Sequence, residues 1–396
     1  MPSIAKVVLH PRKAGAAIGG HPWVYANTIQ DVDGRPNDGD EVAVHAHEGD
    51  RFIGYGLFNS KSDIRIRLYS WTKDATLTND LFRRRIEDAV YYRGKLLGLS
   101  DAKSAVRLVF SEADMLSGLT VDRYGSVLVV QMTSLALSKR LDLLVKALTE
   151  ICRPTGICLR SVSEISKKEG LDLPDQVLAG EIPDEPIVIR DRDLLFEVSL
   201  RQGQKTGFYL DQRENRYVVA DLAKGREVLD LYCYTGGFAL WCAHKLAASV
   251  TAVDSSGPAI LQAKWNAERN QISSVEFIEA DAVDFLKSRA ASSYSMVILD
   301  PPRLAFSQST KERALRMYHR INIEALRVLK SGGILVSCSC SGRVTPSEWI
   351  SLLAGAARRS GRFLQVIEER GAARDHPVSP HCPETHYLKC VIARIY

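Results

Sequence analysis

From about residue 225 onward, short apolar runs alternate along the chain with longer stretches of helical character. In order, these runs are "REVLDLYC", "SVTAVD", "SVEFIEAD", "SMVILD" and "GGILVSCS". Strands that alternate with helices are typical of a doubly wound, mostly parallel sheet, which binds ligands at the carboxyl ends of its strands. This part of the chain is therefore predicted to have an α/β, Rossmann-like fold.

The residues before this region follow two other patterns. The first part is rich in Gly, Val and Ile with D-G turns, and "IRIRLY" (64–69) alternates apolar and basic positions, which predicts a small, barrel-like β domain. Strand-like runs such as "VRLVFSE" and "VLVVQM", followed by a helical stretch over 136–150, predict a compact α+β domain. The acidic, aperiodic stretch "LAGEIPDEPIVI" marks the second boundary. The predicted domains are residues 1–74 (β-rich), 75–184 (α+β) and 185–396 (α/β).

Composition narrows the class of protein. The 396 residues are 45% hydrophobic and 25% charged, as in soluble globular proteins, and the net charge of +5 permits an anionic partner without requiring one. The N-terminus lacks the apolar block of a signal peptide, and no apolar run reaches transmembrane length. Eight cysteines are spread thinly, with no C-x-x-C pair. We expect a reduced, cytoplasmic protein with no membrane partner; a homodimer is compatible with the sequence.

A glycine turn follows the first strand of the α/β region, in "DLYCYTGGFAL". Asp230 ends the strand, Gly236 and Gly237 lie in the turn, and Phe238 opens a helix. Glycines let the backbone approach a ligand closely, and a helix N-terminus offers free N–H groups. The turn differs from the G-x-G-x-x-G pattern of dinucleotide sites, and an ordinary tight turn remains an alternative.

Acidic residues also end the next two strands. Asp254 is placed to accept hydrogen bonds from both hydroxyls of a ribose, and Asp281 from an adenine amino group. Either residue alone would more often be a helix cap. Three carboxylates at successive strand ends, with the glycine turn after the first, favour an adenosine-containing cofactor.

The fourth strand ends in Asp300-Pro301-Pro302, a stiff loop that lacks two N–H donors. A D/N-P-P sequence at this place resembles the motif of S-adenosylmethionine-dependent methyltransferases that act on planar nitrogen heterocycles or amides. Nicotinamide enzymes share the earlier features but not this one. The resemblance implies S-adenosylmethionine as the cofactor.

Two cysteines, Cys338 and Cys340, lie at the end of the fifth strand. In such a sheet this end is next to the end of the fourth strand, so Cys340 and Asp300 are expected to face one pocket, while Cys338 is expected to pack in the interior. Zinc needs about four ligands. The histidines and cysteines near the C-terminus match no zinc-finger spacing, so no metal is expected.

A thiol opposite a methyl donor has a specific use, because carbon 5 of a pyrimidine is a poor nucleophile. A thiolate that adds to carbon 6 makes carbon 5 reactive enough to take the methyl group, and removal of the carbon 5 proton then expels the thiolate. Asp300 is placed to hold the exocyclic amine and ring nitrogen of cytosine. The alternative, in which both cysteines are ordinary packing residues, gives no reason for Cys340 to lie beside Asp300.

Over nearly its whole length the chain resembles the bacterial large-subunit ribosomal RNA cytosine-5 methyltransferases that carry an N-terminal PUA domain. The matching stretches are "HPWVY" (21–25), "GLTVDRYG" (118–125), "SEISKKEGL" (163–171), "GQKTGFYLDQREN" (203–215), "CYTGGFA" (233–239), "LDPPR" (299–303), "SCSG" (339–342) and "DHPV…PETHYLK" (375–389). The resemblance implies a PUA domain, a central α+β domain and a Rossmann-like class I methyltransferase domain. It makes Cys340 the nucleophile and Asp300 the acid that recognises the base. Many related enzymes carry a further cysteine after D-P-P that assists product release; this chain has Arg303 there.

The same resemblance places the segment "KTGFYLDQR" (205–213) at the cofactor and base pocket, although an ordinary turn before a helix remains an alternative. The expected cofactor-binding residues are Asp230, Tyr234, Gly236, Gly237, Phe238, Asp254, Ser255, Asp281, Ala282, Asp300, Pro301, Lys205, Tyr209, Asp211, Gln212 and Arg213.

Basic residues outside this pocket are candidates for contacts with RNA phosphates, although such a stripe is more often only a solvated face. They are Arg65, Arg67, Arg303, Arg313, Arg316 and Arg320. The partner implied is large-subunit ribosomal RNA. Two rivals remain open: a methyltransferase of guanine nitrogen in RNA, which needs no thiol, and a catalytically silent RNA-binding protein on the same fold.

Overall fold

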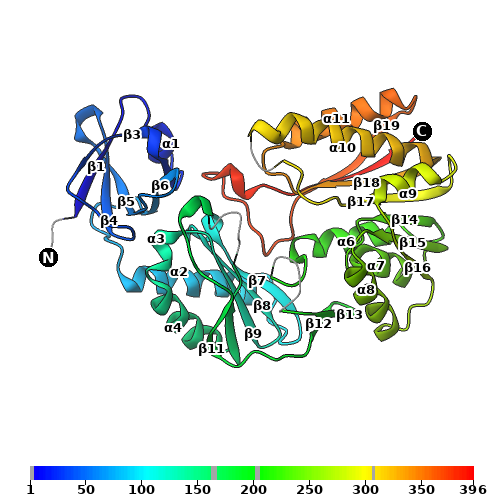
Figure 1. The fold of residues 1–396 in the computed structure, drawn as a ribbon, viewed down its shortest axis with the longest axis horizontal. Coiled ribbons are helices and arrows are strands. Elements are labelled where there is room, and N and C mark those ends of the chain that lie inside the picture. Colours follow the sequence, from blue (N-terminus) through cyan, green and yellow to red (C-terminus); the bar gives the residue numbers. More distant parts are fainter. Residues whose placement is uncertain (1–3, 162–166, 201–205, 306–307) are drawn as a thin grey trace. The chain divides into compact units, whose positions relative to one another are not determined.

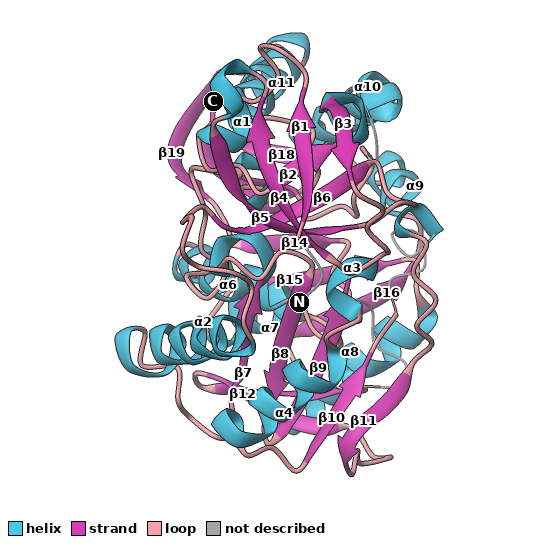
Figure 2. Cartoon of the chain, turned by 90° about the vertical axis from the view of Figure 1, so that its left-hand side faces the viewer, coloured by secondary structure: helices cyan, strands magenta, loops and turns pink. Residues whose placement is uncertain are grey.

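The computed structural model describes residues 4–161, 167–200, 206–305 and 308–396. Helices and strands are mixed along these ranges (Figure 2). The chain divides into two compact units. The first comprises Met1–Ile189, Val198–Phe208 and Arg374–Thr385, and the second comprises Arg190–Glu197, Tyr209–Ala373 and His386–Tyr396.

The first unit begins with a six-stranded sheet in the order β2-β6-β5-β4-β1-β3. Its elements are β1 (Ala5–Leu9), α1 (Gly15–Ile18), β2 (Trp23–Tyr25), β3 (Ile29–Asp33), β4 (Glu41–Ala46), β5 (Phe52–Phe58) and β6 (Ile64–Ser70). The alternation predicted for β6 holds on its apolar face, because Ile66 and Leu68 are buried in the core of this sheet. The other face is covered as well, since Arg67 is only 5% exposed.

A five-stranded sheet in the order β11-β10-β9-β8-β7 follows in the same unit. Its strands are β7 (Ala105–Phe110), β8 (Leu119–Tyr124), β9 (Val127–Met132), β10 (Gly156–Leu159) and β11 (Gln176–Gly180), and its helices are α2 (Asn79–Tyr91), α3 (Leu135–Ser138) and α4 (Leu141–Cys152). The helix predicted over 136–150 is thus broken into α3 and α4. The break falls where Arg140 turns its side chain to donate to the carbonyl of Gly39, at 2.9 Å.

The second unit contains a seven-stranded sheet in the order β16-β15-β14-β17-β18-β20-β19. Its strands are β14 (Glu227–Leu231), β15 (Ser249–Asp254), β16 (Val275–Glu279), β17 (Tyr294–Leu299), β18 (Leu329–Ser339), β19 (Leu364–Arg370) and β20 (Lys389–Ile395). The first five strands are parallel, and β20 pairs antiparallel with both β18 and β19. The predicted doubly wound, Rossmann-like fold is confirmed.

Helices cover both faces of this sheet. They are α6 (Arg213–Asp221), α7 (Gly237–His244), α8 (Gly257–Arg269), α9 (Ala282–Ser288), α10 (Gln308–Val328) and α11 (Pro346–Arg359). Figure 1 shows α9, α10 and α11 on one side of the strands and α6, α7 and α8 on the other. The strand order reverses between β14 and β17, which is where sheets of this type bind ligands. Both Asp230, near the end of β14, and Asp300, just after β17, therefore lie at the binding edge.

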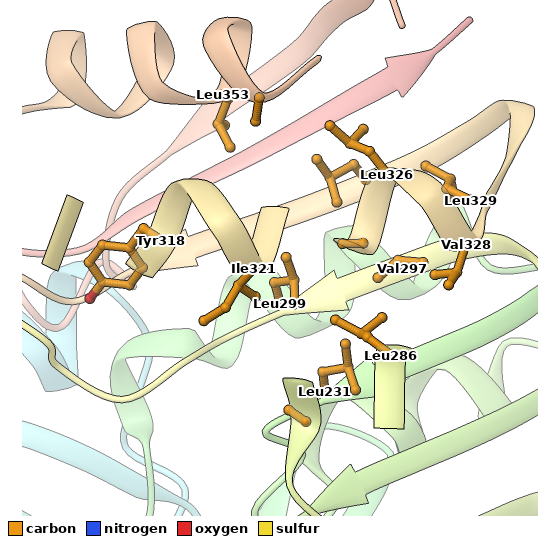
Figure 3. Close-up of a cluster of buried hydrophobic side chains, with 14 of the residues drawn as sticks. Leu231, Leu286, Val297, Leu299, Tyr318, Ile321, Leu326, Val328, Leu329 and Leu353 are labelled. Carbon is orange, nitrogen blue, oxygen red and sulfur yellow. The ribbon is translucent and has the colours of Figure 1, made fainter. Parts of the chain in front are cut away.

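A large apolar core holds α10 against these strand ends. Leu231, Leu299 and Tyr318 belong to it (Figure 3), and Tyr318 meets the ring of Trp349 edge-on, with ring centroids 5.0 Å apart. A close-packed core of this kind resists displacement of its members. The hydroxyl of Tyr318 is therefore held in a fixed position beside the loop that follows β17.

Two more features complete the fold. A two-stranded sheet of β12 (Ile187–Asp191) and β13 (Leu194–Val198) precedes the seven-stranded sheet and was not foreseen from the aperiodic sequence before it. All eight cysteines are free in this structure. Among the helices of the described ranges, none combines the length and the apolarity that crossing a membrane requires.

Candidate active site

Asp230 is the most deeply buried carboxylate at the binding edge, with no exposed surface. Its Oδ2 accepts a hydrogen bond of 2.9 Å from the N–H of Ala239, in the first turn of α7, whereas its Oδ1 is buried without a hydrogen-bond partner. Burial raises the pKa of Asp230 well above its usual range, and repulsion from Asp300 raises it further. The hydrogen bond from Ala239 and the charge of Arg216 act in the opposite direction and offset this increase in part.

The glycine turn after β14 brings backbone into a tight arrangement. Gly236 has a φ of 85°, the left-handed region, and caps the N-terminus of α7. A Cβ on Gly237 would lie 2.6 Å from Nε of Arg216, so only glycine fits beside that buried guanidinium. Tyr234 also has a positive φ, of 49°, and its N–H donates to Oδ2 of Asp254 at 2.9 Å. Asp254 thus fixes the turn as well as ending its own strand.

The next two strand ends differ from each other. Asp254 is half-buried, and its Oδ1 accepts from the N–H of Ser256 at 2.9 Å, while Ser255 beside it is exposed. Asp281 is exposed and caps α9, where its Oδ1 accepts from the N–H groups of two following residues at 2.9 and 3.0 Å. The capping alternative for Asp281 is therefore realised, and contact with an adenine would use its Oδ2. Ala282 is buried in the apolar core.

The segment before α6 reaches the same edge. Tyr209 is half-buried, and its ring lies edge-on to that of Tyr234 at 5.2 Å. Burial raises the pKa of Tyr209, and the charges of Tyr234, Asp300, Asp211 and Cys340 raise it further, in that order. Tyr209 therefore lies within electrostatic reach of both predicted catalytic residues.

The neighbours of Tyr209 have separate partners. Asp211 is buried, and its Oδ2 accepts from the hydroxyl of Tyr387 at 2.5 Å. Nε of Arg213 lies 3.8 Å from Oδ1 of Asp191. Lys205, which the sequence placed at the cofactor, lies outside the described residues.

Asp300 and Cys340 follow neighbouring parallel strands, as predicted. In the β17–β18 register Leu299 is opposite Ser337, so Asp300 is one residue past a paired position and Cys340 follows β18 directly. Cys340 is half-buried. A half-buried thiol at the carboxyl end of a parallel strand, the edge where such sheets bind ligands, is placed to meet a bound molecule.

Cys338 has a different environment, although only one residue separates it from Cys340. It is fully buried and pairs in register with Cys390 of β20. The hydrogen bond to Cys390, together with burial, raises the pKa of Cys338 well above its usual range. An interior thiol that holds its proton is a poor nucleophile, and this fits the expected packing role.

A buried polar network joins the two loops, and the sequence did not reveal it. The hydroxyls of Tyr318 and Ser341 are 2.8 Å apart. Oγ of Ser341 also accepts from the N–H of Ala305 at 3.1 Å, and the hydroxyl of Tyr318 accepts from the N–H of Leu304 at 3.2 Å. The loop after Asp300 is thereby tied to the turn after Cys340.

Arg216 and Lys389 were also missed. Arg216 is 4% exposed, donates to the carbonyl of Tyr209 at 2.8 Å and packs on Gly237. Lys389 is 3% exposed and lies opposite Ser339 in the sheet. Lys389 ends one of the stretches on which the resemblance rests (375–389), and Arg216 directly follows another (203–215), which was the available signal.

The candidate RNA contacts fall into two groups. On α10, Arg313, Arg316 and Arg320 are exposed, as is Arg303 in the loop before the helix. Arg65 is half-buried and donates to the carbonyl of Asn59 at 3.1 Å.

Arg67 needs a correction. It is buried, and its two terminal nitrogens lie 3.2 Å from Oε1 of Glu112 and 3.0 Å from Oε1 of Glu169. Strict alternation put this side chain on an outer face, but that face is covered within the first unit. Two carboxylates occupy the guanidinium, so Arg67 stabilises the fold and is not available to a phosphate.

One cluster of metal-type ligands occurs in the described part of the first unit. Nε2 of His21 and Sγ of Cys382 lie 3.2 and 3.5 Å from Oε2 of Glu384. Nδ1 of His21 accepts from the N–H of Trp23 at 3.1 Å, which leaves the proton of a neutral imidazole on Nε2, where a metal would bind. Hydrogen bonding accounts for the cluster, and the absence of a metal stays a prediction.

Two family models match the chain. Residues 7–71 match a PUA-like domain, and residues 114–386 match an S-adenosylmethionine-dependent methyltransferase. A Streptococcus mutans structure described as an S-adenosylmethionine-dependent methyltransferase covers 99% of this chain and 100% of its own, with a TM-score of 0.83 and 20% identity. The chain belongs to the S-adenosylmethionine-dependent methyltransferase family, and its cofactor is S-adenosylmethionine.

Curated relatives narrow the comparison. The chain is 39% identical, over 99% of both chains, to "Ribosomal RNA large subunit methyltransferase I" of Pseudoalteromonas atlantica. It is 37% identical, again over 99% of both, to the protein of the same name from Shewanella denitrificans. The resemblance noted in the sequence is thus confirmed over the whole length.

The residues at the strand ends fit this cofactor. S-adenosylmethionine carries a positive charge on its sulfonium and another on its amino group. Asp230 has a buried oxygen without a hydrogen-bond partner, and both Asp300 and Asp254 repel it. A cationic ligand relieves that repulsion. Asp254, at the second strand end, is the residue that would bind the ribose.

Replacing Gly237 with Ala is expected to weaken cofactor binding. The new methyl group meets Nε of Arg216 at 2.6 Å, and overpacking of this kind costs about 1–3 kcal/mol, so the Kd for S-adenosylmethionine rises about tenfold or more. Calorimetric titration measures the change. Gly15 is the matched control, since it also opens a helix and a Cβ there meets nothing within 4 Å. Equal affinity in Gly237→Ala and Gly15→Ala would show that the turn tolerates a side chain.

Replacing Asp230 with Asn is expected to stabilise the free protein while weakening cofactor binding. The folded state raises the pKa of this carboxyl, so folding stability falls as the pH rises above the ordinary value of 3.8, and at pH 7 burial of this acidic group opposes folding. An amide keeps an oxygen for the N–H of Ala239 and removes the charge. Thermal unfolding at pH 7 should show a higher Tm without cofactor and a smaller rise on adding S-adenosylmethionine. A lower Tm together with undiminished stabilisation by the cofactor would refute the charge argument.

Proposed function

We propose that the protein transfers a methyl group to carbon 5 of a cytosine in large-subunit ribosomal RNA, through a covalent adduct between Cys340 and carbon 6. The observation that carries this proposal is the half-buried thiol of Cys340 at the end of β18, which adjoins the end of β17 where Asp300 lies. The relatives named as large-subunit ribosomal RNA methyltransferases supply the substrate class.

Cys340 performs the covalent chemistry. Its thiolate forms a sulfur–carbon 6 bond, and the ring's double-bond electrons move so that carbon 5 becomes nucleophilic. Bound S-adenosylmethionine would supply the methyl group to carbon 5 and leave as S-adenosylhomocysteine. A base then takes the proton from carbon 5, the electrons of that bond restore the double bond, and the sulfur–carbon 6 bond breaks to return the thiolate. The chain has Arg303 where many related enzymes carry the cysteine that assists this release.

Asp300 holds the base. It binds the exocyclic amine of cytosine and, in its protonated form, donates to the ring nitrogen, where negative charge develops when the thiolate adds to carbon 6. The polar network of Tyr318 and Ser341 keeps the loop of Asp300 in register with Cys340. Tyr209, which lies within reach of both, forms part of the wall against which the base binds.

RNA recognition is assigned to the surfaces around this site. A base within folded RNA must leave its stack to reach Cys340, at a cost of a few kcal/mol. Exposed arginines on α10, with Arg303, supply phosphate contacts. We propose that residues 1–74, as a PUA-like domain, and residues 75–184 recognise the shape of the RNA, while residues 185–396 carry the reaction. The enzyme acts in the cytoplasm, where its substrate is made. Whether it forms a homodimer is tested by measuring its molecular mass in solution.

One experiment tests the proposed function directly. Unmodified large-subunit ribosomal RNA is incubated with the protein and S-adenosylmethionine carrying a tritiated methyl group, and then digested to nucleosides. We expect the label to co-elute with 5-methylcytidine. Label in a methylated guanosine instead would establish the guanine-nitrogen activity, and absence of label with intact RNA binding would indicate a silent binding protein.

A further inference from the structure

Ser341, the residue after Cys340, is held from three sides within the second unit. Its Oγ lies 2.8 Å from the hydroxyl of Tyr318 and 3.1 Å from the N–H of Ala305, and its carbonyl accepts a hydrogen bond of 2.6 Å from Nζ of Lys389. The first two bonds tie the turn to the loop after β17. The third brings a cationic side chain to the backbone that carries Cys340.

Lys389 reaches this position because β20 is inserted antiparallel beside β18. The strand register places Lys389 opposite Ser339, one residue before Cys340. Nζ also donates to the carbonyl of Tyr387 at 2.8 Å, so two of its three N–H groups are fixed on carbonyls. A lysine that is 3% exposed and anchored in this way has little freedom to move its charge away from the nucleophile.

The electrostatic surroundings agree with this geometry. Burial lowers the pKa of Lys389 to about 8, and Arg303 adds to the decrease, while Cys340 and Glu348 oppose it. Lys389 is therefore mostly charged at pH 7 and loses its charge as the pH rises through about 8. Any help that it gives to a thiolate is present at neutral pH and is lost at high pH.

Other titratable groups also face this thiol. Tyr209 before α6 and Tyr318 on α10 interact electrostatically with Cys340, and each of these tyrosines has a raised pKa, caused first by burial. Asp300, which acts on Tyr209 as well, contributes negative charge. Two neutral phenols and a carboxylate do not favour a thiolate, whereas the positive charge of Lys389, which interacts with Cys340, does.

We propose that Lys389 is a positioning residue for Cys340: anchored on the carbonyl of Ser341, its ammonium fixes the turn that carries the nucleophile and favours the thiolate form at neutral pH. This rests on the proposed role of Cys340. The established family membership does not depend on it. Thiolates are the reactive form of cysteine, and a nearby cation raises their population.

The test measures alkylation of Cys340 by iodoacetamide between pH 6 and 10, followed by mass spectrometry of its peptide. It uses the full chain without RNA or cofactor. In Lys389→Met we expect alkylation of Cys340 to be about tenfold slower at pH 7, because a positive charge near a thiol lowers its pKa by about one unit. Near pH 10 the rates of the variant and the native protein should converge. Lys389→Arg should restore most of the neutral-pH rate.

Controls separate charge from folding and access. Cys152 is half-buried, with a pKa that burial raises to about 11, and its alkylation in the same samples should not change between variants. If the Met variant unfolds, Lys389→Gln takes its place as the neutral variant, because the Gln side chain can still donate a hydrogen bond to a backbone carbonyl. An unchanged Cys340 profile in a folded neutral variant would overturn the proposal, as would equal slowing at every pH. Because no methyl transfer is measured, this result is independent of the test of the proposed function.

Discussion

Replacing Cys340 with Ala is expected to abolish methyl transfer, with a loss of at least about 10³-fold in kcat, because the covalent route to a reactive carbon 5 disappears. The loss should appear in kcat, since nothing assigns the thiol to cofactor binding. Transfer of the tritiated methyl group to RNA under saturating substrate measures the rate. Calorimetry should show unchanged affinity for S-adenosylmethionine.

Cys338→Ala is the matched control for this experiment. Cys338 lies two residues away, but it is fully buried and pairs with Cys390. Its replacement should lower Tm, because a small cavity forms in the sheet, while activity stays within about threefold of the native value. Full activity in Cys340→Ala would exclude covalent catalysis by this residue and revive the guanine-nitrogen alternative.

Replacing Asp300 with Asn is expected to lower kcat by about 10²- to 10³-fold, because an amide cannot give a proton to the ring nitrogen, where negative charge develops. The same change should make Asp230 easier to ionise, since Asp300 contributes to the raised pKa of that carboxyl. Single-turnover methylation rates give the first effect. The pH dependence of cofactor affinity gives the second.

The control for Asp300 is Asp284→Asn on α9. Asp284 is an exposed carboxylate paired with Lys287 at 2.9 Å, and it has no part in the proposed site. Its replacement should leave the single-turnover rate unchanged. A loss of less than about threefold in Asp300→Asn would remove this carboxylate from the reaction.

The strand ends were predictable because a parallel sheet repeats one rule. Each apolar run is followed by its functional residue, so Asp230, Asp254 and Asp300 were expected at one edge from order alone, and β14, β15 and β17 place them there. The adjacency of the fourth and fifth strands also followed from that rule and placed Asp300 and Cys340 at adjoining strand ends.

Other parts of the site depend on pairings that periodicity does not encode. "KCVIARI" is an apolar run like the others, but nothing in it shows that it enters the sheet antiparallel, between β18 and β19, and so delivers Lys389 to the nucleophile. Tyr318 has the spacing of a core residue on α10, and only packing shows that its hydroxyl reaches Ser341. The prediction for Arg67 was wrong for a related reason, because alternation along β6 does not show that both faces of the strand are covered.

The most direct measurement of the central claim uses RNA in which the target cytosine is replaced by 5-fluorocytosine. Fluorine at carbon 5 cannot leave as a proton does, so the reaction should stop at the covalent stage. Denaturing electrophoresis and peptide mass spectrometry should find an RNA–protein adduct on Cys340 that needs S-adenosylmethionine and persists in Cys338→Ala. A stable complex carried by any other residue, or none while unmodified RNA is methylated at the native rate, would contradict the account.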